Sequence, residues 1–147
     1  MSSLAVYRIL WVVGVVREEA IDWFEEGRVD LRRAERSLEY GDFSLSCYLS
    51  QQAIEKVLKA VLIGVKRVRP PHLHDLTVLY GMICDVLPLP DDIRDRIAEV
   101  SQYYVTARYP NAGLIRPSES FSRSQAERAL EVARYVVGEV EKTLTTG

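Results

Sequence analysis

The stretch SCYLSQQAIEKVLKA, residues 46–60, repeats polar and apolar side chains at helical spacing. Gln51, Glu55 and Lys59 stand at i, i+4 and i+8, so they form one stripe along a helix. Two further stripes are apolar, one made of Cys47, Ile54, Leu58 and Val61, the other of Leu49, Ala53, Val57 and Ala60. A helix that is apolar almost all round lies at the centre of a bundle. The polar stripe is therefore predicted to be a buried network or part of a cleft.

Helical periodicity, together with capping and helix-breaking residues, predicts other helices around this one. The expected helices cover about 18–40, 43–65, 74–86 and 91–108, with a last one from 122 or 124 toward the C-terminus. Gly41 ends the first helix and Asp42 caps the second, which predicts an antiparallel pair. Asp91 or Asp92 is expected to cap the fourth helix. Ser124 and Glu127 are expected to form a capping box on the last.

No segment alternates as a half-buried strand would, apart from an ambiguous N-terminus. The predicted fold is all-α, an antiparallel four- to five-helix bundle. Residues 4–16 are apolar but too few to span a bilayer, so residues 1–16 are interpreted as an N-terminal extension. Residues 17–147 form the single expected domain, and we expect a cytoplasmic protein with no membrane association.

Composition excludes some classes of function. The net charge of −2 argues against a protein that binds polyanions through a strongly basic surface, although a small basic site remains open. Cys47 and Cys84 fit no metal-ligand spacing, and Cys47 is expected to be a buried reduced thiol. No metal-binding or nucleotide-binding loop motif is present, so we expect no metal and no cofactor.

Three groups of residues could carry chemistry. Arg108, flanked by Tyr104 and Tyr109 and followed by a proline, could hold a phosphate or stack on a base. The alternative is a structural arginine that anchors the loop through a salt bridge or its tyrosines. His72 or His74 could act as a general acid or base, or His74 could help Asp75 to cap a helix.

The third group is the polar stripe of Gln51, Glu55 and Lys59 together with the neighbouring Gln52 and Lys56. It could line a cleft, or it could be a solvated stripe or a core network satisfied within itself. The basic stretch 66–69 is interpreted as a solvated helix end.

An ordered set of motifs resembles the HEPN domain family, in its small stand-alone prokaryotic form. The matching segments are DL with Ala34 (30–34), YGDF (40–43), CY with QQAIEKVLKA (47–60), HDL (74–76), ARYP (107–110) and AERAL (126–130). The resemblance covers about residues 17–140 and implies a helical bundle that forms a homodimer. It also implies action beside a minimal nucleotidyltransferase protein, often as one half of a toxin–antitoxin pair.

Many members of this family are metal-independent ribonucleases with an Arg-x4-6-His motif, paired across the dimer. The arginine holds the scissile phosphate, and the histidine helps to move protons around the 2′-hydroxyl. In this chain Arg108 stands where that arginine is expected, but positions 113–115 are Gly-Leu-Ile and no histidine follows. Arg67 and Arg69 have the right spacing to His72 and His74, but on the loop after the second helix, so that match is treated as accidental.

The leading hypothesis is a homodimer that binds a nucleotide or an RNA phosphate and acts with a nucleotidyltransferase. Its expected ligand contacts are Arg108, Tyr104, Tyr109, Lys59, Glu55 and Gln51, with His74 able to reach the same cleft. One alternative is a ribonuclease toxin that uses Arg108 with His74 or with tyrosines. Another is a structural module whose polar stripe serves only dimerisation.

Overall fold

The computed structural model describes residues 14–110 and 116–146, and this part of the chain is helical with no strand. Its elements are α2 (Gly14–Glu39), α3 (Phe43–Val61), the π-helix η2 (Leu62–Lys66), α4 (Leu76–Gly81), α5 (Asp91–Ser101), α6 (Tyr103–Thr106), α7 (Pro117–Ser120) and α8 (Arg123–Thr146). The prediction of an all-α bundle is confirmed.

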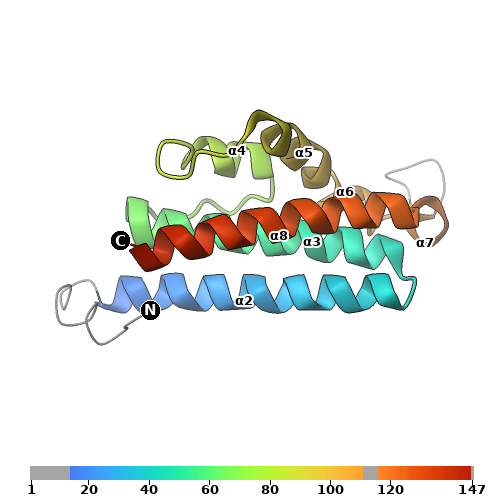
Figure 1. The fold of residues 1–147 in the computed structure, drawn as a ribbon, viewed down its shortest axis with the longest axis horizontal. Helices are drawn as coiled ribbons and strands as arrows, with labels where there is room; N and C mark the ends of the chain where they lie inside the picture. The colour runs from blue at the N-terminus through green and yellow to red at the C-terminus, as the bar shows by residue number, and fades with distance from the viewer. Residues whose placement is uncertain (1–13, 111–115, 147) are drawn as a thin grey trace.

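Three long helices, α2, α3 and α8, lie side by side and form the body of the molecule (Figure 1). α3 and α8 run in the same direction and α2 runs opposite to both, because α4, α5 and α6 carry the chain back along one side of the bundle. α3 contacts every other helix of the described chain. It buries the members of both apolar stripes except the half-buried Leu49. Its position at the centre of the core is therefore as expected.

The turn between α2 and α3 contains Gly41 and Asp42, two residues that favour its conformation. Gly41 has φ 78°, a left-handed conformation that costs glycine little. Asp42 caps α3 by accepting a hydrogen bond from Leu45 N at 3.4 Å, so the predicted antiparallel pair is confirmed.

Farther along the pair, Gly27 allows the two backbones to approach. A β-carbon built there would lie 2.6 Å from Val57 Cγ1 and 3.1 Å from Ala53 O. Close to this contact, Asp30 is buried on α2 and accepts from Lys56 Nζ of α3 at 2.5 Å. A close backbone approach and one partly buried ion pair therefore hold α2 against α3.

The shorter helices differ from their predicted bounds. α4 ends at Gly81 and not near residue 86, because the Tyr80 hydroxyl binds the following turn. That hydroxyl donates to Leu87 O at 2.8 Å and accepts from Leu89 N at 2.9 Å. The expected helix 91–108 is interrupted at Gln102, which separates α5 from α6.

Two predicted caps were placed wrongly. Pro90 is the N-cap of α5, so Asp91 and Asp92 lie in the first turn, where they complement the helix dipole without capping. The capping box of α8 is formed by Ser122 and Gln125. Ser122 Oγ accepts from Gln125 N at 3.1 Å and Gln125 Oε1 accepts from Ser122 N at 3.3 Å. The box begins two residues before the predicted Ser124, because Ser122 directly precedes the first helical residue.

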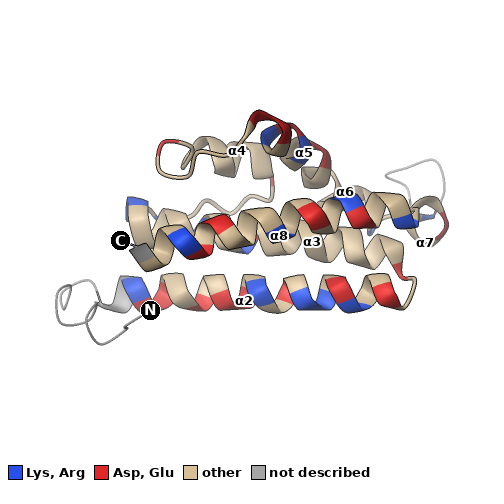
Figure 2. Cartoon of the chain, viewed as in Figure 1, with Lys and Arg blue, Asp and Glu red and all other residues tan. Residues whose placement is uncertain are grey.

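Side chains of both charge signs are interspersed along α2 and α8 (Figure 2), as expected for the solvated faces of a bundle. Within residues 14–110 and 116–146, no helix combines the length and the apolar character needed to cross a membrane. α2 begins at Gly14, and most of the expected extension, residues 1–13, lies outside the described residues.

Candidate functional site

The polar stripe of α3 is buried. Gln51, Glu55 and Lys59 are 0%, 4% and 6% exposed, although each carries a strongly polar side chain. Buried polar groups of this kind are stable only when other groups in the fold satisfy them. The stripe is therefore a buried network, one of the two forms predicted for it.

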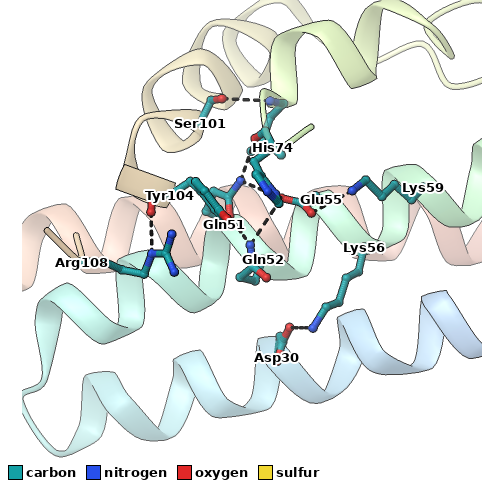
Figure 3. A network of polar contacts seen from close by, with 11 residues as sticks. Asp30, Gln51, Gln52, Glu55, Lys56, Lys59, His74, Ser101, Tyr104 and Arg108 are labelled. Carbon is teal, nitrogen blue, oxygen red and sulfur yellow. Dashed lines mark hydrogen bonds and ion pairs between the residues drawn. The ribbon is translucent and has the colours of Figure 1, made fainter. Parts of the chain in front are cut away.

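Glu55 is the centre of this network (Figure 3). Its Oε2 accepts from Lys59 Nζ at 3.1 Å, and its Oε1 lies 3.0 Å from His74 Nδ1. Gln51 Nε2 and Gln52 Nε2 approach the same Oε1 at 3.3 and 3.4 Å. One carboxylate thus joins a lysine on its own helix to a histidine 19 residues away in the chain.

The contact with Glu55 orients the imidazole of His74. An ionised carboxylate only accepts hydrogen bonds, so Nδ1 is the donor. In the neutral ring Nε2 is then left as the acceptor, the atom that could take a proton from a ligand. The side chain of His74 is 44% exposed, so a ligand in solvent can reach it.

The backbone around His74 is held by three contacts. Its carbonyl accepts from Gln51 Nε2 at 3.0 Å. The next residue, Asp75, caps α4 through Thr77 N at 2.9 Å, as expected, and the Thr77 hydroxyl holds the pKa of the Asp75 carboxyl below its ordinary value. Ser101 Oγ accepts from Leu76 N at 2.9 Å, which ties α4 to the end of α5. The His74 side chain itself binds Glu55 and does not cap the helix.

Tyr104 connects the histidine to the arginine. The His74 ring stacks on the Tyr104 ring with centres 3.8 Å apart and planes at 12°. Arg108 Cζ lies 4.3 Å from the same ring centre, and Arg108 Nε donates to Tyr104 O at 2.8 Å. His74 and Tyr104 also form part of the wall of a cavity of about 360 Å³ that opens between α4 and α5.

Three tyrosine rings surround the Arg108 guanidinium. Its Cζ lies 4.3 to 4.9 Å from the ring centres of Tyr104, Tyr109 and Tyr48. Arg108 is exposed and pairs with no carboxylate among the described residues, and residues 1–13 and 111–115 contain no Asp or Glu. The aromatic contacts orient the cation without neutralising its charge. The cation–π arrangement weighed from the sequence is therefore present, and the salt bridge is not seen in the described part.

Tyr48 and Gln52 also belong to the site, although neither is among the ligand contacts expected from the sequence. Tyr48, Gln52 and Glu55 follow one another at i, i+4 and i+7, so helical spacing alone would have placed them on the polar stripe. Burial raises the pKa of Tyr48, and the Arg108 charge opposes that rise only in part. Tyr48 therefore stays a neutral hydrogen-bond donor at neutral pH.

The tertiary structure thus brings the sequence candidates into one connected set: Gln51, Glu55, Lys59, His74, Tyr104, Arg108 and Tyr109. No cluster of three or more His, Cys, Asp or Glu side chains suited to a metal ion occurs among the residues described. The exposed members of this set are Arg108, whose charge no described carboxylate neutralises, Tyr109 and His74.

Comparison with known proteins identifies the family to which the chain belongs. A family model described as "HEPN domain" matches residues 20–143. The chain belongs to the HEPN domain family. A search of curated proteins found no match.

Two solved structures share the fold of this HEPN protein. TT1696 from Thermus thermophilus is 31% identical, with a TM-score of 0.76 over 85% of this chain and 98% of that one. ST0689, described as an archaeal HEPN homologue, is 24% identical, with a TM-score of 0.71 over 86% and 98% of the two chains.

Proposed function

We propose that this HEPN protein is a homodimer that binds a nucleotide or an RNA phosphate through Arg108. The observation that carries the proposal is the exposed guanidinium, held by three tyrosine rings and a backbone carbonyl and paired with no carboxylate of the described chain. A pre-oriented arginine can bind a phosphate with two parallel hydrogen bonds. Tyr109, 47% exposed beside it, offers a ring face for a nucleobase.

The family suggests the biological setting of this site. Small stand-alone HEPN proteins often act beside minimal nucleotidyltransferases, in many cases as one half of a toxin–antitoxin pair. We propose the same partnership for this chain. A homodimer would place two copies of Arg108 in one assembly and so allow one nucleic-acid strand to be held at two phosphates. Light scattering of the purified protein should give about twice the 16.7 kDa chain mass.

A ribonuclease is the second candidate, and one contact favours it. His74 does not follow Arg108 in the sequence as the histidine of the family motif does. Its ring nevertheless stacks on Tyr104, the ring that Arg108 also contacts, and Glu55 orients its Nδ1. An arginine for the phosphate and an oriented imidazole for proton transfer are the two groups that metal-independent cleavage at a 2′-hydroxyl requires. The imidazole would then come from the segment before α4 instead of from the residues after Arg108.

The test measures binding and cleavage on the same proteins. Fluorescence anisotropy with a labelled single-stranded RNA should show about tenfold weaker binding for Arg108→Ala and a smaller loss for Arg108→Lys. Arg94→Ala is the matched control, because Arg94 is also an exposed arginine over a tyrosine ring, with its Cζ 5.7 Å from the Tyr80 centre. Unchanged affinity in Arg108→Ala would remove Arg108 from the site.

Incubation of the RNA in EDTA separates the two functions. Cleavage by the wild-type protein that is lost in both Arg108→Ala and His74→Ala would establish the ribonuclease. Binding without cleavage would support the binding protein instead. Cleavage that survives in His74→Ala would refute the role assigned to this histidine.

A further inference from the structure

A second pocket lies at the other end of the polar stripe, where Lys59 is part of the lining and Arg108 is not. It has a volume of about 360 Å³ and is formed where the N-terminal part of α2, the end of α3 with η2, and the loop of residues 67–72 meet. Its volume lies in the range of small-molecule sites. The role proposed for Arg108 makes no use of this pocket.

Half of the residues that line the pocket are apolar. Trp23 of α2 and Ile63 of η2 contribute two apolar side chains, and the Trp23 ring is only partly buried. Pro70 and Pro71 also line the pocket, and their rings restrict the backbone of the loop. The indole and the two prolines therefore offer apolar surface to a planar group.

The charged lining is mainly positive. Lys59, Arg67 and Arg69 contribute cations and Glu19 a single carboxylate. Lys59 Nζ lies 5.6 Å from the Trp23 ring centre and is already paired with Glu55. Arg67 and Arg69 are exposed and form no ion pair with any residue that the structure describes. The pocket thus combines apolar side chains with two exposed arginines that form no ion pair within the described residues.

The backbone that leads to Arg67 has two unusual features, a π-helical turn and a left-handed residue. The last turn of the α3 segment widens into η2, and π-helical turns are rare and concentrate at functional sites. Arg67 follows with φ 55°, the one non-glycine residue at positive φ in the described ranges. Val68 N then donates to Leu62 O at 3.0 Å, which fixes the start of the loop that lines the pocket. Gly64 lets η2 approach α2, since a β-carbon there would lie 2.9 Å from Ala20 Cβ.

We propose that this pocket binds a small organic anion, with a planar apolar body against Trp23 and a carboxylate or phosphate group at Arg67 and Arg69. The unpaired arginines select the negative head group, and the indole and prolines select the apolar body. Neither an inorganic anion nor a neutral hydrocarbon would use both halves of the site.

The test uses the full chain carrying Trp11→Phe, so that Trp23 is the single tryptophan. The aromatic sulfonate anilinonaphthalene sulfonate is the anionic probe and N-phenyl-1-naphthylamine is its neutral counterpart. Binding of the anionic probe in the pocket should quench Trp23 emission through energy transfer. Arg69→Gln should weaken the anionic probe roughly three- to tenfold and leave the neutral one unchanged. Arg36→Gln, at the far end of α2, is the matched control and should change neither.

Competition separates the two kinds of head group. Displacement of the anionic probe by benzoate identifies a carboxylate ligand, and displacement by phenyl phosphate identifies a phosphate ligand. The proposal is overturned if Trp23 is not quenched, if Arg36→Gln acts like Arg69→Gln, or if neither competitor displaces the probe. Arg108→Ala should not change probe affinity, so this result is independent of the proposed RNA site.

Discussion

Removal of the Glu55 charge should destabilise the protein far more than removal of an exposed glutamate in an equally short ion pair. In Glu55→Gln the amide keeps the shape of the side chain, but Lys59, 8% exposed at its side chain, keeps a buried charge with no carboxylate beside it. Breaking a buried pair from one side costs about 3–5 kcal/mol. The glutamine carbonyl can still accept from Lys59 Nζ, so we expect a loss of about 3 kcal/mol, at the lower end of that range.

Urea denaturation followed by circular dichroism at pH 7 measures this loss as a change in the free energy of unfolding. In a thermal melt it corresponds to a fall in Tm of roughly 6–12 °C for a chain of this size. Glu131→Gln is the matched control, because Glu131 pairs with Arg96 at 3.0 Å but is 70% exposed. The control should lose less than about 1 kcal/mol.

A double-mutant cycle tests the reasoning further. Lys59→Met removes the unpaired charge, so Glu55→Gln should cost much less in that background than in the wild type. We expect a coupling free energy of at least about 1.5 kcal/mol. Equal losses in Glu55→Gln and Glu131→Gln, or a coupling near zero, would show that Glu55 and Lys59 are not a mutually dependent buried pair.

Three further predictions concern packing and reactivity elsewhere in the bundle. Gly27→Ala should destabilise by about 1–2 kcal/mol, because its methyl group has no room between α2 and α3. Gly138→Ala meets nothing within 4 Å and should stabilise by about 0.5–1 kcal/mol, so thermal melts of the two variants should shift in opposite directions. Asp30→Asn should cost about 2 kcal/mol in urea titration, since it leaves a lysine of α3 without its buried carboxylate; a change below about 0.5 kcal/mol would contradict this. Burial raises the pKa of Cys47 to about 12, so at pH 8 iodoacetamide should label only the exposed Cys84, as read by mass spectrometry, until the protein is unfolded. Equal labelling of both thiols in the folded protein would refute the burial of Cys47.

The sequence determined the central features of α3 because they depend on local spacing alone. A period of about 3.6 residues is enough to group Gln51, Glu55 and Lys59 on one face and to surround them with apolar stripes. Capping by Asp42 and Asp75 likewise follows from side chains that bind backbone groups two or three residues away. These interactions are short in sequence, so a pattern of residues predicts them.

The tertiary structure alone decided how the candidate residues meet. His74 reaches Glu55 because the loop after η2 runs back along α3, and no local rule specifies that path. The break at Gln102 sets the orientation of α6, and so determines that Tyr104 stacks on His74 while Arg108 lies against the same ring. The sequence could name the arginine, the tyrosines and the histidine. Their arrangement depends on contacts between segments distant in the chain, since side chains from α3, α6 and the segment before α4 must pack together before the site exists.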